Sequence, residues 1–245
     1  MKRFAFLCTA VIAAMTLTTN AEAQISVNAG YNLISHTSQT VVGNTTFDDE
    51  PTNLHGFYVN GAYNIAFLSK GSRTLSVEPG LTYSFGGKIL SFERLENSYS
   101  KVSRRDHYLD IPINLKYSFD LLPRKVRIST YLGPILSFGL AAAEIAHTEL
   151  GDYWMSSRLN LYSNKYTLNS SEVSFSTSGN EGDIIFDFFD LRIGIGIGIT
   201  ILENYLIQTG YHFGLLNRAS AKETEFLAKP ISHTNVFHIG VGYIF

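Results

Sequence analysis

Large apolar side chains alternate with small or polar ones along eight separate segments of this chain of 245 residues. In the clearest segment, every second residue from Leu109 to Phe119 is large and apolar, and the residues between them are mostly polar. A period of two places these two sets on opposite faces of a β-strand. The sequence therefore predicts an all-β protein with eight strands, at residues 25–34, 56–67, 73–86, 107–119, 125–141, 183–199, 205–216 and 233–245.

The connections between these segments are alternately long and short. The first, third, fifth and seventh are long and polar, and the fifth, residues 142–182, is the longest. Bacterial outer-membrane barrels have an even number of antiparallel strands, short turns at the periplasmic end and long loops at the other end. The pattern predicts an eight-stranded antiparallel up-and-down transmembrane β-barrel with both termini in the periplasm.

The bulky faces of the strands are expected to point outward. The interior of an eight-stranded barrel is only wide enough for side chains to fill it, and rows of Leu, Ile and Phe would overfill it. Facing outward, the same rows contact lipid, and each segment reaches the roughly 9–11 tilted residues that a membrane strand needs. The outward aromatic residues gather near the strand ends, as in interfacial girdles: Tyr63, Phe67, Tyr83, Phe85, Tyr117, Phe119, Tyr205, Tyr243 and Phe245.

The N-terminus has the features of a cleaved secretory signal peptide, residues 1–23. Lys2 and Arg3 precede an apolar run, and Ala21-Glu22-Ala23 matches the small-residue cleavage pattern. Residues 24–245 are then expected to form a single outer-membrane β-barrel domain. The one cysteine, Cys8, lies in the signal segment, so the mature chain has no disulfide or thiol chemistry.

Composition and charge argue against several functions. The formal net charge of −2 gives no basis for a nucleic-acid partner. Three consecutive carboxylates, Asp48, Asp49 and Glu50, could bind a hard cation, but such a run is more often a solvated loop. The sequence therefore predicts no metal site and no cofactor.

Six charged residues share the parity of the inward face, three acidic and three basic. We interpret them as a luminal charge network, because buried charges are tolerated when they are paired and hydrogen-bonded. Counted from the short turns, the first three lie low and the last three higher: Glu78, Lys116 and Arg127, then Asp110, Asp190 and Arg192. The prediction is a lumen filled by side chains, and the alternative is a narrow porin-like diffusion channel whose selectivity these residues set.

A second alternative is an enzyme carried by the loops. Asp106 and His107, together with the many loop serines, supply the atoms of a Ser/His/Asp hydrolase or an acyltransferase acting on lipid or surface polymers. No nucleophile motif fixes any of these residues, and Asp106 with His107 fits the cap of a strand end. The sequence therefore predicts a protein that is not an enzyme.

Two adjoining segments resemble a known family. Tyr108-Leu-Asp-Ile-Pro-Ile-Asn-Leu-Lys-Tyr-Ser-Phe119, followed by Tyr131-Leu-Gly-Pro134, is similar to the central hairpin of the outer-membrane beta-barrel domain family, whose members are often labelled porin-family proteins. The resemblance covers nearly the whole mature chain. It implies an eight-stranded barrel in the outer membrane of a Gram-negative bacterium, and it carries over no catalytic residues.

The last segment ends on an outward aromatic residue. We interpret its outward row as the signal by which the barrel-assembly machinery recognises the chain, after periplasmic chaperones have delivered it: Phe237, Ile239, Val241, Tyr243 and Phe245. The expected function is that of an integral outer-membrane barrel with a structural role, or with an adhesive role in which its loops bind an extracellular ligand. Outer-membrane lipid is the other expected partner.

Overall fold

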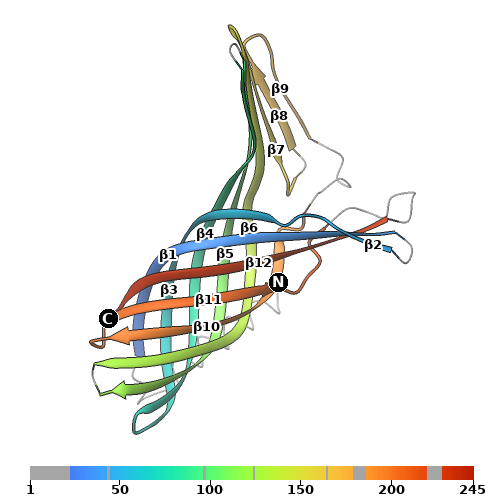
Figure 1. The fold of residues 1–245 in the computed structure, drawn as a ribbon. Helices are drawn as coiled ribbons and strands as arrows, with labels where there is room; N and C mark the ends of the chain where they lie inside the picture. Colours follow the sequence, from blue (N-terminus) through green and yellow to red (C-terminus); the bar gives the residue numbers. More distant parts are fainter. Residues whose placement is uncertain are drawn as a thin grey trace.

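Eight long strands close into a ring in the computed structural model (Figure 1). The structure describes residues 23–42, 45–95, 98–123, 125–163, 165–178, 186–219 and 228–245. The barrel strands are β1 (Ala23–Val42), β3 (Thr52–Lys70), β4 (Arg73–Leu95), β5 (Ser98–Leu122), β6 (Val126–Leu150), β10 (Phe189–Ile201), β11 (Tyr205–Gly214) and β12 (Ala228–Ile244). Each pairs antiparallel with its neighbours in this order, and β12 pairs with β1. The predicted fold class is confirmed.

The strand register fixes the width of the barrel. From Ala23, successive partners around the ring are Ile65, Val77, Leu115, Leu132, Ile195, Tyr211, Phe237 and finally Leu33. The path returns to β1 ten residues beyond its start, from Ala23 to Leu33. Such a stagger goes with strands tilted by about 35–45° and an interior that side chains can fill.

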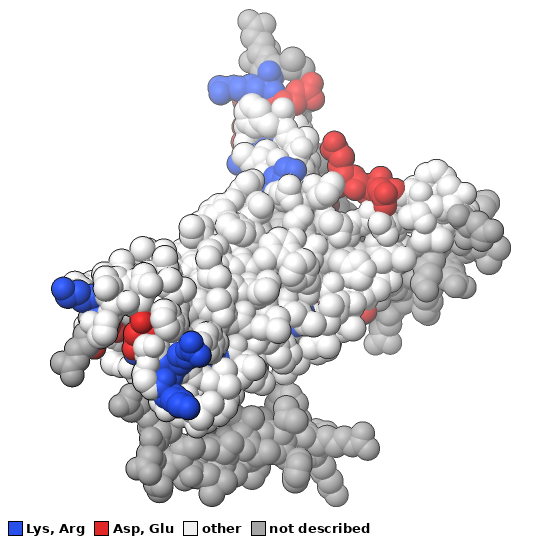
Figure 2. Space-filling view, turned by 60° about the horizontal axis from the view of Figure 1, so that its bottom comes forward, with Lys and Arg blue, Asp and Glu red and all other residues white. Residues whose placement is uncertain are grey.

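The apolar rows face outward, as predicted. Leu81, Leu132 and Ile197 are each 53% exposed, whereas their neighbours of the opposite parity are buried or partly buried. Figure 2 shows Lys, Arg, Asp and Glu gathered toward the ends of the molecule, with a broad band free of them between. No helix in the described part of the chain is long and apolar enough to cross a membrane.

Aromatic side chains border the apolar band at the loop end. Tyr83 Oη lies 2.7 Å from Nδ1 of His107 on the outer surface, and Tyr31 Oη lies 2.6 Å from Nδ1 of His55. The ring of Phe85 lies 5.0 Å from that of His107. Outward aromatic groups with a polar tip suit the interface between hydrocarbon and headgroups.

The long connections differ from the prediction, because much of their length is β-strand. The strands of the barrel continue past the aromatic border, and four further strands extend them: β2 (Thr45–Asp48), β7 (Tyr153–Asn160), β8 (Lys165–Ser170) and β9 (Ser174–Ser178). The ends of β4, β5 and β6 with β7, β8 and β9 form the large arm; β2 with the ends of β1 and β12 forms the small arm (Figure 1). Both faces of an arm are outside the lipid, so its sequence carries little alternation of apolar and polar residues, and the prediction took it for loops.

Two predictions fall partly on residues outside the described ranges. The signal peptide falls on residues 1–23, of which Ala23 alone is described, as the first residue of β1. The sixth predicted strand was expected from residue 183, whereas β10 begins at Phe189, and residues 183–185 are outside the described ranges.

Candidate functional site

Five of the six charged residues that the sequence pattern assigns to the lumen are buried there, and the sixth, Arg127, lies at its rim. Lys116 donates from Nζ to Oε2 of Glu78 at 2.5 Å, near the short turns. Both residues are buried, at 8% and 4% exposure. Arg127 does not join this pair: its Nε donates to Oδ1 of Asp120 at 2.6 Å, because Asp120 is its partner across the β5–β6 ladder. The Arg127 side chain is 39% exposed, so this pair lies at the rim.

The other three predicted residues meet in one fully buried cluster. Arg192 Nε donates to Oδ2 of Asp190 at 3.0 Å, and its Nη1 lies 3.5 Å from Oδ2 of Asp110. None of the three is more than 1% exposed. One guanidinium therefore serves two carboxylates, which leaves this cluster with a formal charge of −1. The guanidinium carbon also lies 4.9 Å from the ring centre of Tyr108, a cation–π distance.

A second buried cluster, which we call the mouth cluster, lies at the loop end of the lumen: His36, Arg104, Asp106, Tyr108, Arg218 and Thr234. Asp106 is fully buried and accepts hydrogen bonds from Arg104, through Nε and Nη2 at 3.1 Å each. Tyr108 Oη donates to Asp106 at 3.2 Å, and His36 Nε2 lies 2.8 Å from the same carboxylate. The two arginines and Asp106 carry a net charge of +1, which balances the cluster around Arg192.

Arg218 closes the mouth from the connection between β11 and β12. Its Nη1 donates to Tyr108 Oη at 3.1 Å and to Thr234 Oγ1 at 3.0 Å. Its Nη2 donates to Tyr162 Oη at 3.1 Å and to the Asp187 carbonyl at 2.7 Å, and its Nε donates to the same carbonyl at 3.1 Å. These bonds use all five N–H donors of a guanidinium. Three connecting segments, around Tyr162, Asp187 and Arg218, are thereby tied together over the lumen.

The sequence prediction missed the mouth cluster. The alternation predicts a fourth strand that begins at His107, with Asp106 as its cap, whereas β5 begins at Ser98 and Asp106 faces inward. Asp106 and Arg104 share the parity of Asp110, so extending the alternation by a few residues would have found them. Arg218 and Tyr162 lie outside the strands, and no periodicity points to them.

Asp106 and His107 do not converge on a serine. They are neighbours in one strand, so their side chains lie on opposite faces, and His107 contacts Tyr83 on the outer surface. A different set has the order of a catalytic triad: Thr234 Oγ1 lies 3.1 Å from His36 Nδ1, and His36 in turn contacts Asp106. Thr234 is 1% exposed and bound by Arg218, so a substrate would have to displace that arginine to reach it.

His36 lies beyond the apolar band, since the outward residues on either side of it, Ser35 and Thr37, are polar. Burial lowers the pKa of His36 to about 4, and the hydrogen bond to Asp106 opposes this shift. Arg104 and Arg218 lower the pKa further. His36 is therefore neutral at physiological pH, and it takes part in the mouth cluster as an uncharged imidazole.

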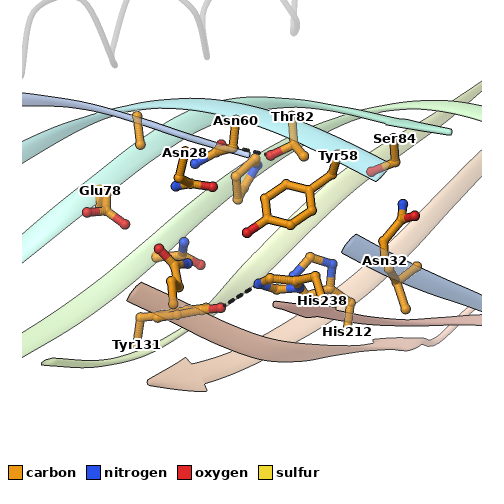
Figure 3. Close-up of a pocket in the computed structure, with 15 residues that line it drawn as sticks. Asn28, Asn32, Tyr58, Asn60, Glu78, Thr82, Ser84, Tyr131, His212 and His238 are labelled. Carbon is orange, nitrogen blue, oxygen red and sulfur yellow. Dashed lines mark hydrogen bonds between the residues drawn. The ribbon is translucent and has the colours of Figure 1, made fainter. Parts of the chain in front are cut away.

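A small polar cavity separates the Lys116–Glu78 pair from the higher clusters (Figure 3). Its volume is about 30 Å³, enough for about two water molecules. Tyr131 Oη lies 2.9 Å from His238 Nε2 at its wall. Tyr58 Oη, His212 Nδ1 and both polar atoms of the Asn32 amide have no hydrogen-bond partner among the described residues. Water can satisfy such groups, because it both donates and accepts.

In the part of the chain that the structure describes, no group of three or more His, Cys, Asp or Glu residues could hold a metal ion. Asp48, Asp49 and Glu50 belong to that part, and β2 ends at Asp48.

A ring of eight antiparallel strands with an apolar outer band and charged clusters inside defines an integral outer-membrane β-barrel. The model of the outer membrane protein beta-barrel domain family matches residues 16–219, and the chain belongs to this family.

The chain is also similar to solved structures of outer-membrane proteins. Ail, the attachment invasion locus protein of Yersinia pestis, in complex with the heparin analogue sucrose octasulfate, is 14% identical with a TM-score of 0.38, over 91% of this chain and 99% of that one. The outer membrane protein OprG from Pseudomonas aeruginosa is 10% identical with a TM-score of 0.41, over 92% and 97%. The outer membrane enzyme PagL is 9% identical with a TM-score of 0.35, over 87% and 98%. None of the curated protein sequences compared with the chain matches it.

Proposed function

We propose that this outer-membrane protein is a closed barrel that carries a binding surface on its large arm, and that it acts by attachment rather than by transport or catalysis. The observation that carries the proposal is the closure of the lumen by Arg218, whose donors hold three connecting segments together. Below it, the Arg192 cluster and the Lys116–Glu78 pair add two more layers of paired charge. A lumen occupied at three levels favours a scaffold over a diffusion channel.

The arm offers the surface that such a scaffold would present. At its far end, Tyr153, Trp154 and Met155 are 63%, 42% and 46% exposed. They line an open hollow of about 260 Å³ together with Ser170 and Glu172. Exposed aromatic side chains beside polar groups supply contact area at low entropic cost, as in many binding surfaces.

Bilayer conductance tests the closed lumen. Protein reconstituted in a planar bilayer is expected to give no stable pore, because paired charges and Arg218 occupy the path. Large, stable, ohmic conductance from the wild-type protein would overturn the proposal in favour of the narrow channel.

Cell attachment tests the arm. Cells carrying the protein are expected to be retained on surfaces coated with polysaccharide or with protein, and the variant Tyr153→Ser with Trp154→Ser is expected to lose most of that retention. A matched variant, Tyr117→Ser with Tyr205→Ser, removes two exposed tyrosines at the opposite end of the barrel. Equal retention of wild type and arm variant on every coating would contradict the proposal.

Export and assembly complete the proposal: a signal peptide at residues 1–23, both termini in the periplasm, and recognition of the last strand by the assembly machinery. Phe245 supports this, because its side chain is 71% exposed while its backbone N–H donates to the Ile25 carbonyl. Deleting Phe245 should lower the amount of heat-modifiable barrel in the outer membrane and leave export across the inner membrane unchanged. Normal levels of folded barrel after the deletion would count against this role.

A further inference from the structure

A hollow lies on the outer surface where the large arm leaves the barrel. Gly87 contributes to its lining and pairs with Arg105 across the β4–β5 ladder. With no side chain at Gly87, a space of about 210 Å³ remains between Phe85 and Ile89. This hollow is distinct from the lumen, because six of its eight lining residues have the outward parity: Phe85, Gly87, Ile89, Lys101, Ser103 and Arg105.

The hollow is lined by cations and by no carboxylate. Lys88, Lys101 and Arg105 contribute to its walls, and Ser103 lies between the last two along β5. Lys101 and Arg105 are four residues apart on one face of the strand, which puts their Cα atoms about 13 Å apart. Within the described ranges, neither side chain has an ion pair or a hydrogen bond to another residue. Arg104 is different, since its guanidinium turns inward to Asp106.

The hollow lies at the level of the lipid headgroups along the barrel axis. Phe85 forms its lower wall and belongs to the outer aromatic border, with its ring 5.5 Å from that of Phe57 and 5.0 Å from that of His107. Below this border the outer surface is apolar, and above it lie Lys101 and Arg105, which make no ion pair with another described residue. Phosphate groups of membrane lipids lie at this boundary, and basic pockets there bind them.

We propose that this hollow binds the phosphorylated sugar headgroup of an outer-leaflet glycolipid. Arg105 and Lys101 would each pair with an anionic group through charge-assisted hydrogen bonds. Their separation suits a headgroup with two anionic groups better than a single phosphate ion. The acyl chains would lie along the apolar band below Phe85, and the lipid would fix the base of the large arm against the membrane surface.

The experiment measures binding of fluorescent bisphosphorylated lipid A to the purified, folded protein in neutral detergent micelles. Lys101→Gln with Arg105→Gln should weaken binding about 30-fold, since each cation near a membrane surface contributes about a fivefold effect. The matched control is Lys70→Gln with Arg73→Gln, an equal change of charge at the exposed short turn between β3 and β4. An equal loss in both variants would reduce the effect to general attraction and overturn the site.

A second variant keeps the charges and fills the space. A Cβ at Gly87 would lie 3.5 Å from Cζ of Phe85, an ordinary contact, so Gly87→Val should fold and still bind lipid A several-fold less tightly. Unchanged binding in this variant would overturn the hollow as the site.

Two further binding measurements identify the ligand. Dephosphorylated lipid A should bind as weakly as the double variant, and equal binding of both lipids would overturn recognition of phosphate. Inorganic phosphate should not displace lipid A at concentrations comparable with the lipid, and displacement would mean a site for free phosphate, against the proposal. Heat modifiability on unheated gels verifies that every variant is folded.

Discussion

The two ends of the lumen differ in how their buried charges are paired. Near the short turns one lysine meets one glutamate, and the polar cavity lies directly beside them. At the loop end, Arg218 and Asp106 bind partners from strands and from two connecting segments besides the one that carries Arg218. The lower pair depends on the barrel alone, whereas the mouth cluster depends on how the connections fold. The stability of the lower pair should therefore depend on the strand register of the barrel, and that of the mouth cluster on the folding of the connecting segments.

Replacing Arg192, which lies between the two ends, should have the largest effect. Arg192→Met leaves Asp110 and Asp190 buried without their shared cation, and breaking a buried pair in this way costs about 3–5 kcal/mol. Urea unfolding of protein refolded in lipid vesicles measures the change. The triple variant with Asp110→Asn and Asp190→Asn should recover much of the loss; no recovery would mean that the carboxylates are not the cause.

Removing Arg218 should come next, with a loss of about 3 kcal/mol for a fully bonded buried guanidinium. The more specific sign is access to the lumen. Without residues 1–23 the chain has no cysteine, so Asn32→Cys supplies a single, fully buried thiol. A water-soluble maleimide added from the loop side should label this thiol slowly in the wild-type background and much faster with Arg218→Ala. Equal labelling rates would show that Arg218 does not close the mouth.

Acid should weaken the mouth cluster. The folded pKa of His36, about 4, is below its unfolded value, so the unfolded chain binds the extra proton and stability falls as the pH drops below about 6.5. Between pH 7.5 and pH 5, His36 should account for about 2 kcal/mol of lost stability. Comparing urea unfolding of wild type and His36→Gln at both pH values isolates this share. The same pH dependence in both proteins would assign the effect to other groups.

The smallest effect is expected at the lower pair. Lys116→Met leaves Glu78 without its cation, but water in the neighbouring cavity can hydrate the carboxylate, so the loss should be about 1 kcal/mol. A loss as large as that of Arg192→Met would remove the distinction between a hydrated and a dry part of the lumen. Urea unfolding at neutral pH decides between them.

The barrel could be predicted because lipid and lumen impose opposite demands on alternate residues. Leu109 and Asp110 occupy successive positions, and each has a side chain that suits its own face. Beyond Phe85 and His107 the lipid ends, both faces meet water, and the alternation weakens, so the sequence predicts a loop where the structure has β7, β8 and β9. Arg104 and Asp106 lie at that border, and the sequence pattern does not predict them as luminal residues. The contacts of Arg218 with Tyr162 and Asp187 join segments far apart in the chain, and nothing in the spacing of these residues indicates that they meet.

The continuity of the strands into the large arm has a mechanical consequence. β5 runs for 25 residues without interruption, roughly 80 Å, from the short turns to the tip of the arm. A pull on the tip along this strand loads the ladders with β4 and β6 in shear, so many hydrogen bonds resist together instead of opening one after another. Tension at the cell surface would pass through the backbone into the barrel wall, and the arm would behave as a stiff lever rather than as a tether.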